Sequence, residues 1–148
     1  MVVQGWWNTY LLSFDQEMTP QLSQSKPPTT AQIARTKWGL GSGAVWLRDG
    51  KVWPGANRKP DARTAVAVDE RQRLLFLAVG EWISPRRLFC FLAQLGAQDG
   101  ILLDGGSSSA MAIGEGAKAA PSRLVLGGWR PAATYLGIKA APLEAAGH

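Results

Sequence analysis

One stretch of the chain, residues 74–103, limits the fold most, because it combines two short apolar runs with one well-marked helix. Residues 74–79 and 100–103 have the length and apolar character of buried strands. Between them, Ser84 is suited to cap a helix, Pro85 to its first position, and Gly96 to its end. The helix is expected to bury one broad apolar face, formed by Leu88, Phe89, Phe91, Leu92 and Leu95. The stretch therefore predicts a strand–helix–strand unit.

Most of the remaining regular structure is expected to be β. Residues 44–53 alternate around Asp49-Gly50, a dipeptide typical of the type I′ hairpin turn. Residues 63–68 pair with 74–79 in a second hairpin, and their near-continuous apolar composition predicts a central position in the sheet. Further strands are expected within residues 1–14, 110–113, 123–126 and 134–138. These patterns predict an α+β fold with a mixed β-sheet and one main helix.

The length of 148 residues fits one domain, expected to occupy residues 1–140. Within it, residues 15–30 are rich in Gln, Ser, Thr and Pro and predict a long surface loop. Residues 141–148 are expected to form a weakly ordered tail. No apolar run approaches the roughly 20 residues of a membrane-spanning helix, and the first residues do not read as a signal peptide. A cytoplasmic location is therefore expected by default, unless the start of the chain has been trimmed.

The scarcity of histidine and cysteine restricts the chemistry. The only histidine is His148, the last residue, and the only cysteine is Cys90. Ser-His-Asp triads, Cys-His dyads and thiolate zinc clusters are therefore excluded, as is an intrachain disulfide. Acid–base catalysis must fall to carboxylates. Because the 16 Lys and Arg residues are dispersed along the chain, their excess over 11 Asp and Glu favours anionic partners without predicting nucleic-acid binding.

The segment that follows the second apolar run carries the strongest functional signal. Asp104 is followed by two glycines and three serines, Gly105, Gly106, Ser107, Ser108 and Ser109. Glycine permits close approach to the backbone, so successive N–H groups and serine hydroxyls can surround an anion such as phosphate, beside a carboxylate. The alternative is an ordinary tight turn after a strand.

Two arginines extend this candidate site. Arg63 begins a predicted strand, and Arg130 lies just before the last one. Each arginine taken alone is typical of a solvated surface. Together with the glycine-rich loop, they would form a bidentate clamp for a phosphate dianion.

The order of these motifs resembles the phosphodiester glycosidase family. Residues 63–66 (RTAV), 103–111 (LDGGSSSAM) and 130–133 (RPAA) are similar to the family's Arg-Thr-Ala, Leu-Asp-Gly-Gly-Gly-Ser and Arg-Pro-Val-Ala segments, in the same order. Residues 4–8 (QGWWN) are taken as the counterpart of an Asn-Gly-Gly-Phe-Phe segment, which adds Trp7 and Asn8 to the substrate-binding residues. The resemblance covers most of the chain.

The resemblance implies a hydrolase that cleaves the glycosidic bond of a sugar-1-phosphate diester, releasing the sugar and leaving a phosphomonoester. The residues that carry over are Arg63, Thr64, Asp104, Gly105, Gly106, Ser108 and Arg130. The absence of a usable histidine is compatible with this reaction, because a phosphate monoester leaves without a strong general acid. Asp104 is the candidate nucleophile or base, and the sugar phosphate or glycan is the expected partner. No cofactor or metal is expected.

The chain departs from the family pattern at several positions. Ser107 replaces a third glycine, and Ala110 replaces a threonine. Where the family often has Asp-Gly-Arg, this chain has Gly80-Glu81-Trp82. Glu81 either replaces the missing carboxylate or is a solvated loop residue. These departures leave two alternatives: a non-catalytic binder of anionic glycans or glycosyl phosphates, and an accessory domain completed by a partner chain.

Overall fold

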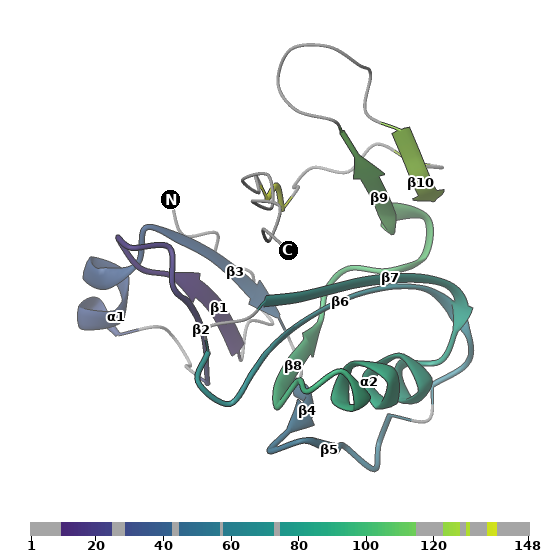
Figure 1. Ribbon diagram of the computed structural model, residues 1–148, viewed down its shortest axis with the longest axis horizontal. Coiled ribbons are helices and arrows are strands. Elements are labelled where there is room, and N and C mark those ends of the chain that lie inside the picture. Colours follow the sequence, from purple (N-terminus) through teal and green to yellow (C-terminus); the bar gives the residue numbers. More distant parts are fainter. Residues whose placement is uncertain are drawn as a thin grey trace, which may run out of the picture.

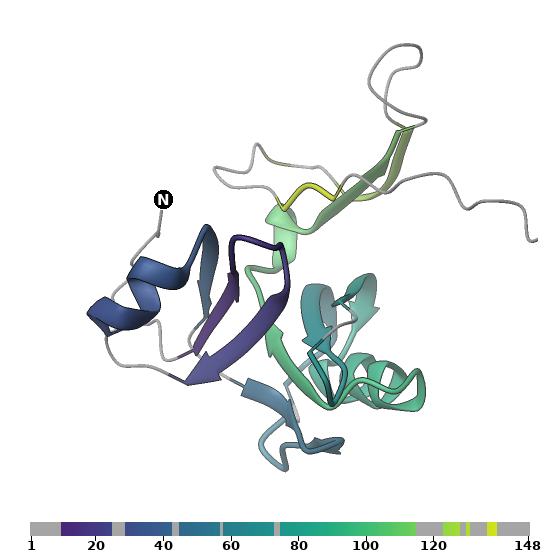
Figure 2. The ribbon, with the colours of Figure 1, turned by 60° about the vertical axis from the view of Figure 1, so that its left-hand side comes forward.

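The computed structural model describes residues 10–24, 29–42, 45–56, 58–72, 75–114, 123–127, 130 and 136–138. The predicted α+β class with one main helix is confirmed. A three-stranded sheet of β1 (Tyr10–Phe14), β2 (Pro20–Gln24) and β3 (Trp38–Ser42) precedes a five-stranded sheet, and a short helix α1 (Thr30–Arg35) lies between β2 and β3 in the sequence. Figure 2 shows the five-stranded sheet between this first sheet and the main helix α2 (Pro85–Gln94).

The five-stranded sheet has the order β5-β4-β8-β6-β7 (Figure 1). Its strands are β4 (Val45–Arg48), β5 (Lys51–Val52), β6 (Asp61–Val68), β7 (Leu75–Ile83) and β8 (Asp99–Leu102). Because β6 pairs antiparallel with both β7 and β8, these two run in the same direction and are connected through α2. The strand–helix–strand prediction is therefore confirmed.

Two details of the predicted sheet are corrected. Every described pair of neighbouring strands is antiparallel, whereas a mixed sheet was predicted. Strands β7 and β8 run in the same direction, but β6 lies between them. The second strand of the hairpin, β7, lies at the edge of the described sheet rather than in its centre. Its apolar composition reflects the packing of Phe76, Leu77 and Ala78 against the two cores.

The first hairpin and the main helix follow their sequence signals. Asp49 and Gly50 have φ values of 50° and 70°, as the predicted type I′ turn requires. Ser84 accepts a hydrogen bond from the Arg87 N–H at 3.4 Å, and Gly96 follows the helix with a φ of 100°. The helix is thus capped at both ends by the expected residues.

The buried face of α2 is narrower than predicted. Pro85, Leu88, Phe89 and Leu92 are buried, and these positions form one i, i+3, i+4, i+7 stripe. Phe91 and Leu95 lie beside this stripe and are 52% and 54% exposed. The prediction that they belong to the buried face was therefore wrong.

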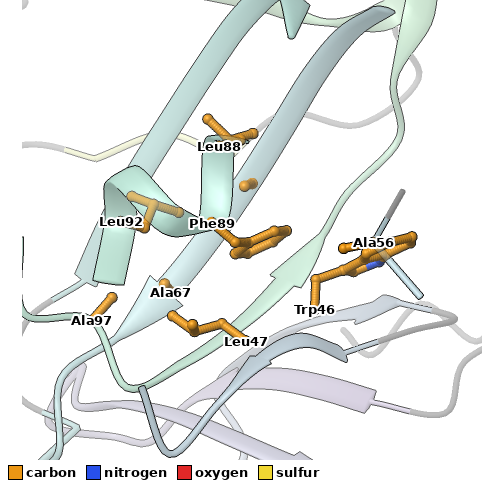
Figure 3. Close-up of a cluster of buried hydrophobic side chains, with 9 residues drawn as sticks. Trp46, Leu47, Ala56, Ala67, Leu88, Phe89, Leu92 and Ala97 are labelled. Atoms are coloured by element: carbon orange, nitrogen blue, oxygen red, sulfur yellow. The ribbon is translucent and has the colours of Figure 1, made fainter. Parts of the chain in front are cut away.

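The sheet is covered on both faces, because β6 supplies alternate residues to two apolar clusters. Ala65 and Ala67 pack with Phe89 and Leu92 of α2 and with Trp46 (Figure 3). On the opposite face, Val66, Val68 and Ile101 pack with Leu12 of the three-stranded sheet. The two layers therefore fix β6 and β8 between them.

The predicted surface loop at residues 15–30 was wrong over much of its length. Asp15 Oδ1 accepts hydrogen bonds from the N–H groups of Glu17 and Thr19, which close a turn between β1 and β2. Strand β2 then pairs with β1 along its whole length, with Pro20 buried and Leu22 packed against the second cluster. The polar composition of this segment reflects a strand with one exposed face.

After β8, a separate pair of strands forms, β9 (Ala110–Ile113) and β10 (Arg123–Gly127), as predicted. Figures 1 and 2 show this pair extending away from the five-stranded sheet. Residues 136–138 form no strand, which corrects that part of the prediction for 134–138. Trp7, Asn8 and the tail 141–148 lie outside the described residues. In the described part of the chain, none of the helices has the length and apolar composition to cross a bilayer.

Candidate functional site

Strands β6 and β8 bring Arg63 and Asp104 to the same end of the sheet. In the register of this pair, Ala65 lies opposite Leu102, and the Leu103 N–H donates to the Thr64 carbonyl oxygen at 2.8 Å. The next opposite pair in this antiparallel register is Arg63 on β6 and Asp104, which lies just after the end of β8. Residues 41 positions apart in the sequence are thus neighbours at the start of the candidate site.

Both carboxylate oxygens of Asp104 accept hydrogen bonds from its own loop. Oδ1 accepts from the Gly105 N–H at 2.9 Å, and Oδ2 accepts from the Ser108 hydroxyl at 2.6 Å. The Ser108 bond is the main influence that lowers the pKa of Asp104; partial burial opposes it, while the Gly105 N–H and the positive charge of Arg130 lower the pKa further. Asp104 is therefore held as a carboxylate.

The loop after Asp104 is a single 3₁₀ turn, η1 (Gly106–Ser108), closed by the Ser109 N–H donating to the Gly106 carbonyl oxygen at 3.0 Å. Gly106 has a φ of 64°, which favours glycine. At Gly105, a Cβ atom would lie 3.0 Å from the Ala62 carbonyl oxygen and 3.4 Å from Arg63 Nη1. The two glycines therefore allow the loop to turn and to lie directly against β6.

The Arg63 side chain is held next to this loop, and its buried Nε–H is unused. Its Nη2 donates to the Lys59 carbonyl oxygen at 3.0 Å and lies 4.0 Å from Asp61 Oδ2. The side chain is only 14% exposed, and its buried Nε has no hydrogen-bond partner among the described residues. Buried polar groups in proteins are normally hydrogen-bonded, so this Nε is suited to donate to a bound oxygen.

Thr64, which was predicted to bind substrate, is hydrogen-bonded to the residue that ends the Asp104 loop. Its hydroxyl donates to the Ser109 hydroxyl at 3.1 Å, and Ser109 is completely buried. The backbone of Gly127 lies so close to the Ser109 carbonyl oxygen that no Cβ would fit there, so β10 passes directly against the end of the loop. Thr64 and Gly127 thus fix the position of η1.

The other predicted residues lie at different distances from Asp104. Arg130 is exposed, and its charge reaches the Asp104 carboxylate. Ser107 is exposed on η1. Glu81 and Trp82 form a bulge in β7 between Gly80, the partner of Arg63, and Ile83, the partner of Asp61. The Glu81 carboxylate is exposed and makes no hydrogen bond or ion pair with the described residues, so the structure brings it to this end of the sheet without connecting it to Asp104.

Sequence reasoning did not select Asp61, and it considered Ser109 only as one of the three serine hydroxyls of the loop. Asp61 Oδ2 lies 3.9 Å from the position of a Cβ on Gly106, so this carboxylate faces the loop from β6. The sequence feature that could have identified Asp61 is its position two residues before Arg63, which places both side chains on the same face of a strand. Nothing in the sequence indicated that the Ser109 hydroxyl accepts a hydrogen bond from Thr64. Within the described part of the chain, no group of three or more His, Cys, Asp or Glu residues could hold a metal ion.

Comparison with known proteins adds a family and a fold. A family model described as phosphodiester glycosidase (NAGPA) matches residues 2–139. Among solved structures, the chain is similar to the catalytic domain of zebrafish N-acetylglucosamine-1-phosphodiester alpha-N-acetylglucosaminidase, auto-inhibited by its pro-peptide, with a TM-score of 0.58 and 16% identity. The match covers 70% of this chain and 41% of that chain, so this chain spans about two fifths of the zebrafish structure.

A hypothetical protein from Synechocystis is also similar, with a TM-score of 0.44 and 17% identity over 70% of this chain and 29% of that chain. No curated protein matches. At these identities, the likeness to the zebrafish domain establishes the fold.

Proposed function

The chain belongs to the phosphodiester glycosidase family, and from this premise we propose that it hydrolyses the glycosidic bond of a sugar-1-phosphate diester. The products would be the free sugar and a phosphomonoester. The family assignment confirms the resemblance predicted from the sequence. The reaction is supported by the arrangement at the end of β6 and β8.

The observation that carries the proposal is the buried, unpartnered Nε of Arg63 beside Gly105. A phosphate oxygen can accept from this Nε, and the charged guanidinium strengthens such a bond. The N–H of the adjacent residue, Gly105, is already used by Asp104, so Arg63 would be the main phosphate ligand on this side of the loop. Arg130, whose charge reaches Asp104, would supply the second guanidinium.

The proposed reaction creates two opposite charges that the site must stabilise. When the bond between the anomeric carbon and the phosphate oxygen breaks, negative charge grows on the phosphate and positive charge on the sugar ring. The two arginines would stabilise the departing phosphate. Asp104, which is held as a carboxylate, would stabilise the sugar cation or act as the nucleophile or base. Glu81 stays a predicted catalytic residue without a contact to support it.

A panel of synthetic esters tests this function. The phenyl esters of glucose, galactose, mannose and N-acetylglucosamine 1-phosphates, in α and β forms, would be incubated with the chain, and the free sugar measured by NMR. The N-acetylglucosamine esters are included because the name of the zebrafish relative describes that linkage. We expect release of sugar from at least one ester, and a loss of about 100-fold or more in kcat for Asp104→Asn.

Glu70→Gln is the matched control, because Glu70 is exposed in the turn at the opposite end of the β6–β7 hairpin. This variant should retain normal turnover. Equal turnover by Asp104→Asn and the unmodified chain would contradict the proposed role of Asp104. No turnover of any ester would contradict the proposed hydrolysis.

A second function is supported by Glu81, which stands where the family often has Asp-Gly-Arg. Its carboxylate makes no hydrogen bond or ion pair with the described residues, so it is not connected to Asp104. Binding of a glycosyl phosphate without hydrolysis is therefore the alternative, either as a binder or as an accessory domain that a partner chain completes. Calorimetry with the same esters separates these functions, because binding without product after long incubation would favour the non-catalytic one.

A further inference from the structure

We propose that Asp61 is a second catalytic carboxylate of this site, the group that accepts a proton from the attacking water. The inference rests on the proposed function, because it assigns one step of that reaction to a residue outside the predicted set.

The position of Asp61 follows from strand geometry. It is the first residue of β6, two positions before Arg63, so both side chains lie on the same face of the strand. This face is the one that Ala65 and Ala67 continue toward α2. Asp61, Arg63 and the loop after Asp104 are therefore gathered at one end of a single sheet face.

The two oxygens of Asp61 have different environments. Oδ1 accepts the Ala62 N–H at 2.8 Å, which fixes the carboxylate plane. Oδ2 lies 4.0 Å from Arg63 Nη2, beyond hydrogen-bond distance, and accepts no hydrogen bond from the described residues. The side chain is 50% exposed. Oδ2 is thus open to water while its position is held.

Asp104 is less suited to this task. Both of its oxygens already accept hydrogen bonds from Gly105 and Ser108. A carboxylate stabilised in this way binds a proton weakly, which suits a permanent negative charge better than a proton acceptor. The site then contains two carboxylates in different environments, the arrangement that glycoside hydrolysis commonly uses.

Gly106 brings the loop that follows Asp104 close to Asp61. Asp104 receives the Gly105 N–H, and Asp61 Oδ2 faces the position where Gly106 would carry a Cβ, 3.9 Å away. At Gly106, apart from its chain neighbours, Asp61 Oδ2 is the one atom of the described residues within 4 Å of the Cβ position, so the loop passes next to this carboxylate. Because the Asp61 side chain is half exposed, a water molecule beside the loop can reach Oδ2.

The step balances without a further reactant. Water transfers a proton to Asp61 Oδ2 while its oxygen bonds to the anomeric carbon. In a direct displacement, the phosphate oxygen departs in the same step with the electron pair of the bond that breaks. Where Asp104 has already displaced the phosphate, the bond between the anomeric carbon and Asp104 breaks instead, and Asp104 departs as the carboxylate with that electron pair. Asp61 then releases the proton to solvent or to the phosphomonoester, and the carboxylate is regenerated.

The test uses the full chain and the phenyl glycosyl phosphate that it hydrolyses fastest. For Asp61→Ala we expect kcat to fall about 100-fold or more, and sodium azide to restore turnover with formation of the glycosyl azide, because azide attacks without losing a proton. Asp61→Asn keeps the side-chain shape but cannot accept the proton, so its kcat should fall to a similar extent. Among the described residues, Arg63 is the charged group that faces Asp61, with Nη2 4.0 Å from Oδ2. Glu70→Gln is the control.

Three results would overturn the role of Asp61. Normal turnover by Asp61→Ala would do so, and loss of turnover that azide does not restore would show that Asp61 positions Arg63 instead. If circular dichroism shows that the alanine variant is unfolded, normal turnover by Asp61→Asn would decide against the proposal. Absence of turnover by the unmodified chain is a separate outcome, because it removes the proposed hydrolysis and the role of Asp61 with it.

Discussion

The Ser108 hydroxyl donates a 2.6 Å hydrogen bond to the carboxylate of Asp104, four residues earlier in the same loop. The hydroxyl also lies 2.9 Å from the Gly105 carbonyl oxygen, so the 3₁₀ turn brings it into contact with both residues. This contact couples the shape of the loop to the protonation of its carboxylate.

Replacing Ser108 by alanine should move the titration of Asp104 to higher pH. The Ser108 bond is the largest influence that lowers the pKa of Asp104, so its removal raises that pKa toward the ordinary value. A lowered carboxyl pKa contributes stability that is present above the unfolded pKa and is lost as the pH falls through the folded pKa. In Ser108→Ala this contribution should shrink, and the carboxylate should protonate earlier on acidification.

The measurement is an NMR titration of the Asp104 carboxyl carbon, with the acidic limb of kcat/KM as a second readout. Ser107→Ala is the matched control, because Ser107 is the exposed neighbour on the same turn and donates no hydrogen bond to Asp104. Identical titration curves for Ser108→Ala and the unmodified chain would contradict the assigned cause.

Replacing Gly105 by alanine should weaken anion binding. The new Cβ would lie 3.0 Å from the Ala62 carbonyl oxygen and 3.4 Å from Arg63 Nη1, so the loop or the guanidinium must shift. We expect weaker binding of inorganic phosphate by calorimetry and a loss of stability of about 1 kcal/mol in urea. In the control Gly137→Ala, the Cβ meets nothing within 4 Å. Equal phosphate affinity of the two variants would contradict the close fit at Gly105.

Much of the fold could be predicted because local chemistry and tertiary packing agree. Ser84, Pro85 and Gly96 mark the ends of α2, and the Asp49-Gly50 turn has the positive φ values that its sequence favours. The sequence also predicted that Asp104 follows a buried strand, because residues 100–103 are uniformly apolar.

The errors concern properties that only tertiary packing determines. The strand β2 is polar because one of its faces is exposed, and composition alone does not distinguish such a strand from a loop. Likewise, Asp61 looks like a turn residue after Pro60, and its relation to Gly106 appears only when β6 lies against the loop. The contact between Thr64 and Ser109 spans 45 residues and has no local signal at either end.

Removing the Phe89 side chain should destabilise the fold far more than removing that of Phe91. Phe89 is completely buried, and its ring lies against Gly100, where a Cβ would come within 2.8 Å of it. Such a truncation typically costs about 3–5 kcal/mol, because apolar contacts are lost and a cavity is left. Phe91 is on the same helix and half exposed, so Phe91→Ala should cost less than about 1 kcal/mol. Urea unfolding measures both, and similar costs for the two variants would contradict the position of the buried stripe.

The hydrogen bond between Thr64 and Ser109 should appear as a coupling in a double-mutant cycle. Either Thr64→Val or Ser109→Ala leaves one hydroxyl without its partner in a buried or partly buried place, at a cost of about 1–3 kcal/mol. The double variant removes both hydroxyls, so the second substitution should cost about 1 kcal/mol less in the presence of the first. Urea unfolding of the four proteins gives this coupling. Because the pair fixes the end of the Asp104 loop, both single variants should also weaken phosphate binding, whereas Phe91→Ala, which lies outside the buried stripe of α2, should leave it unchanged. Strictly additive stabilities would mean that the two hydroxyls do not hold the loop to β6.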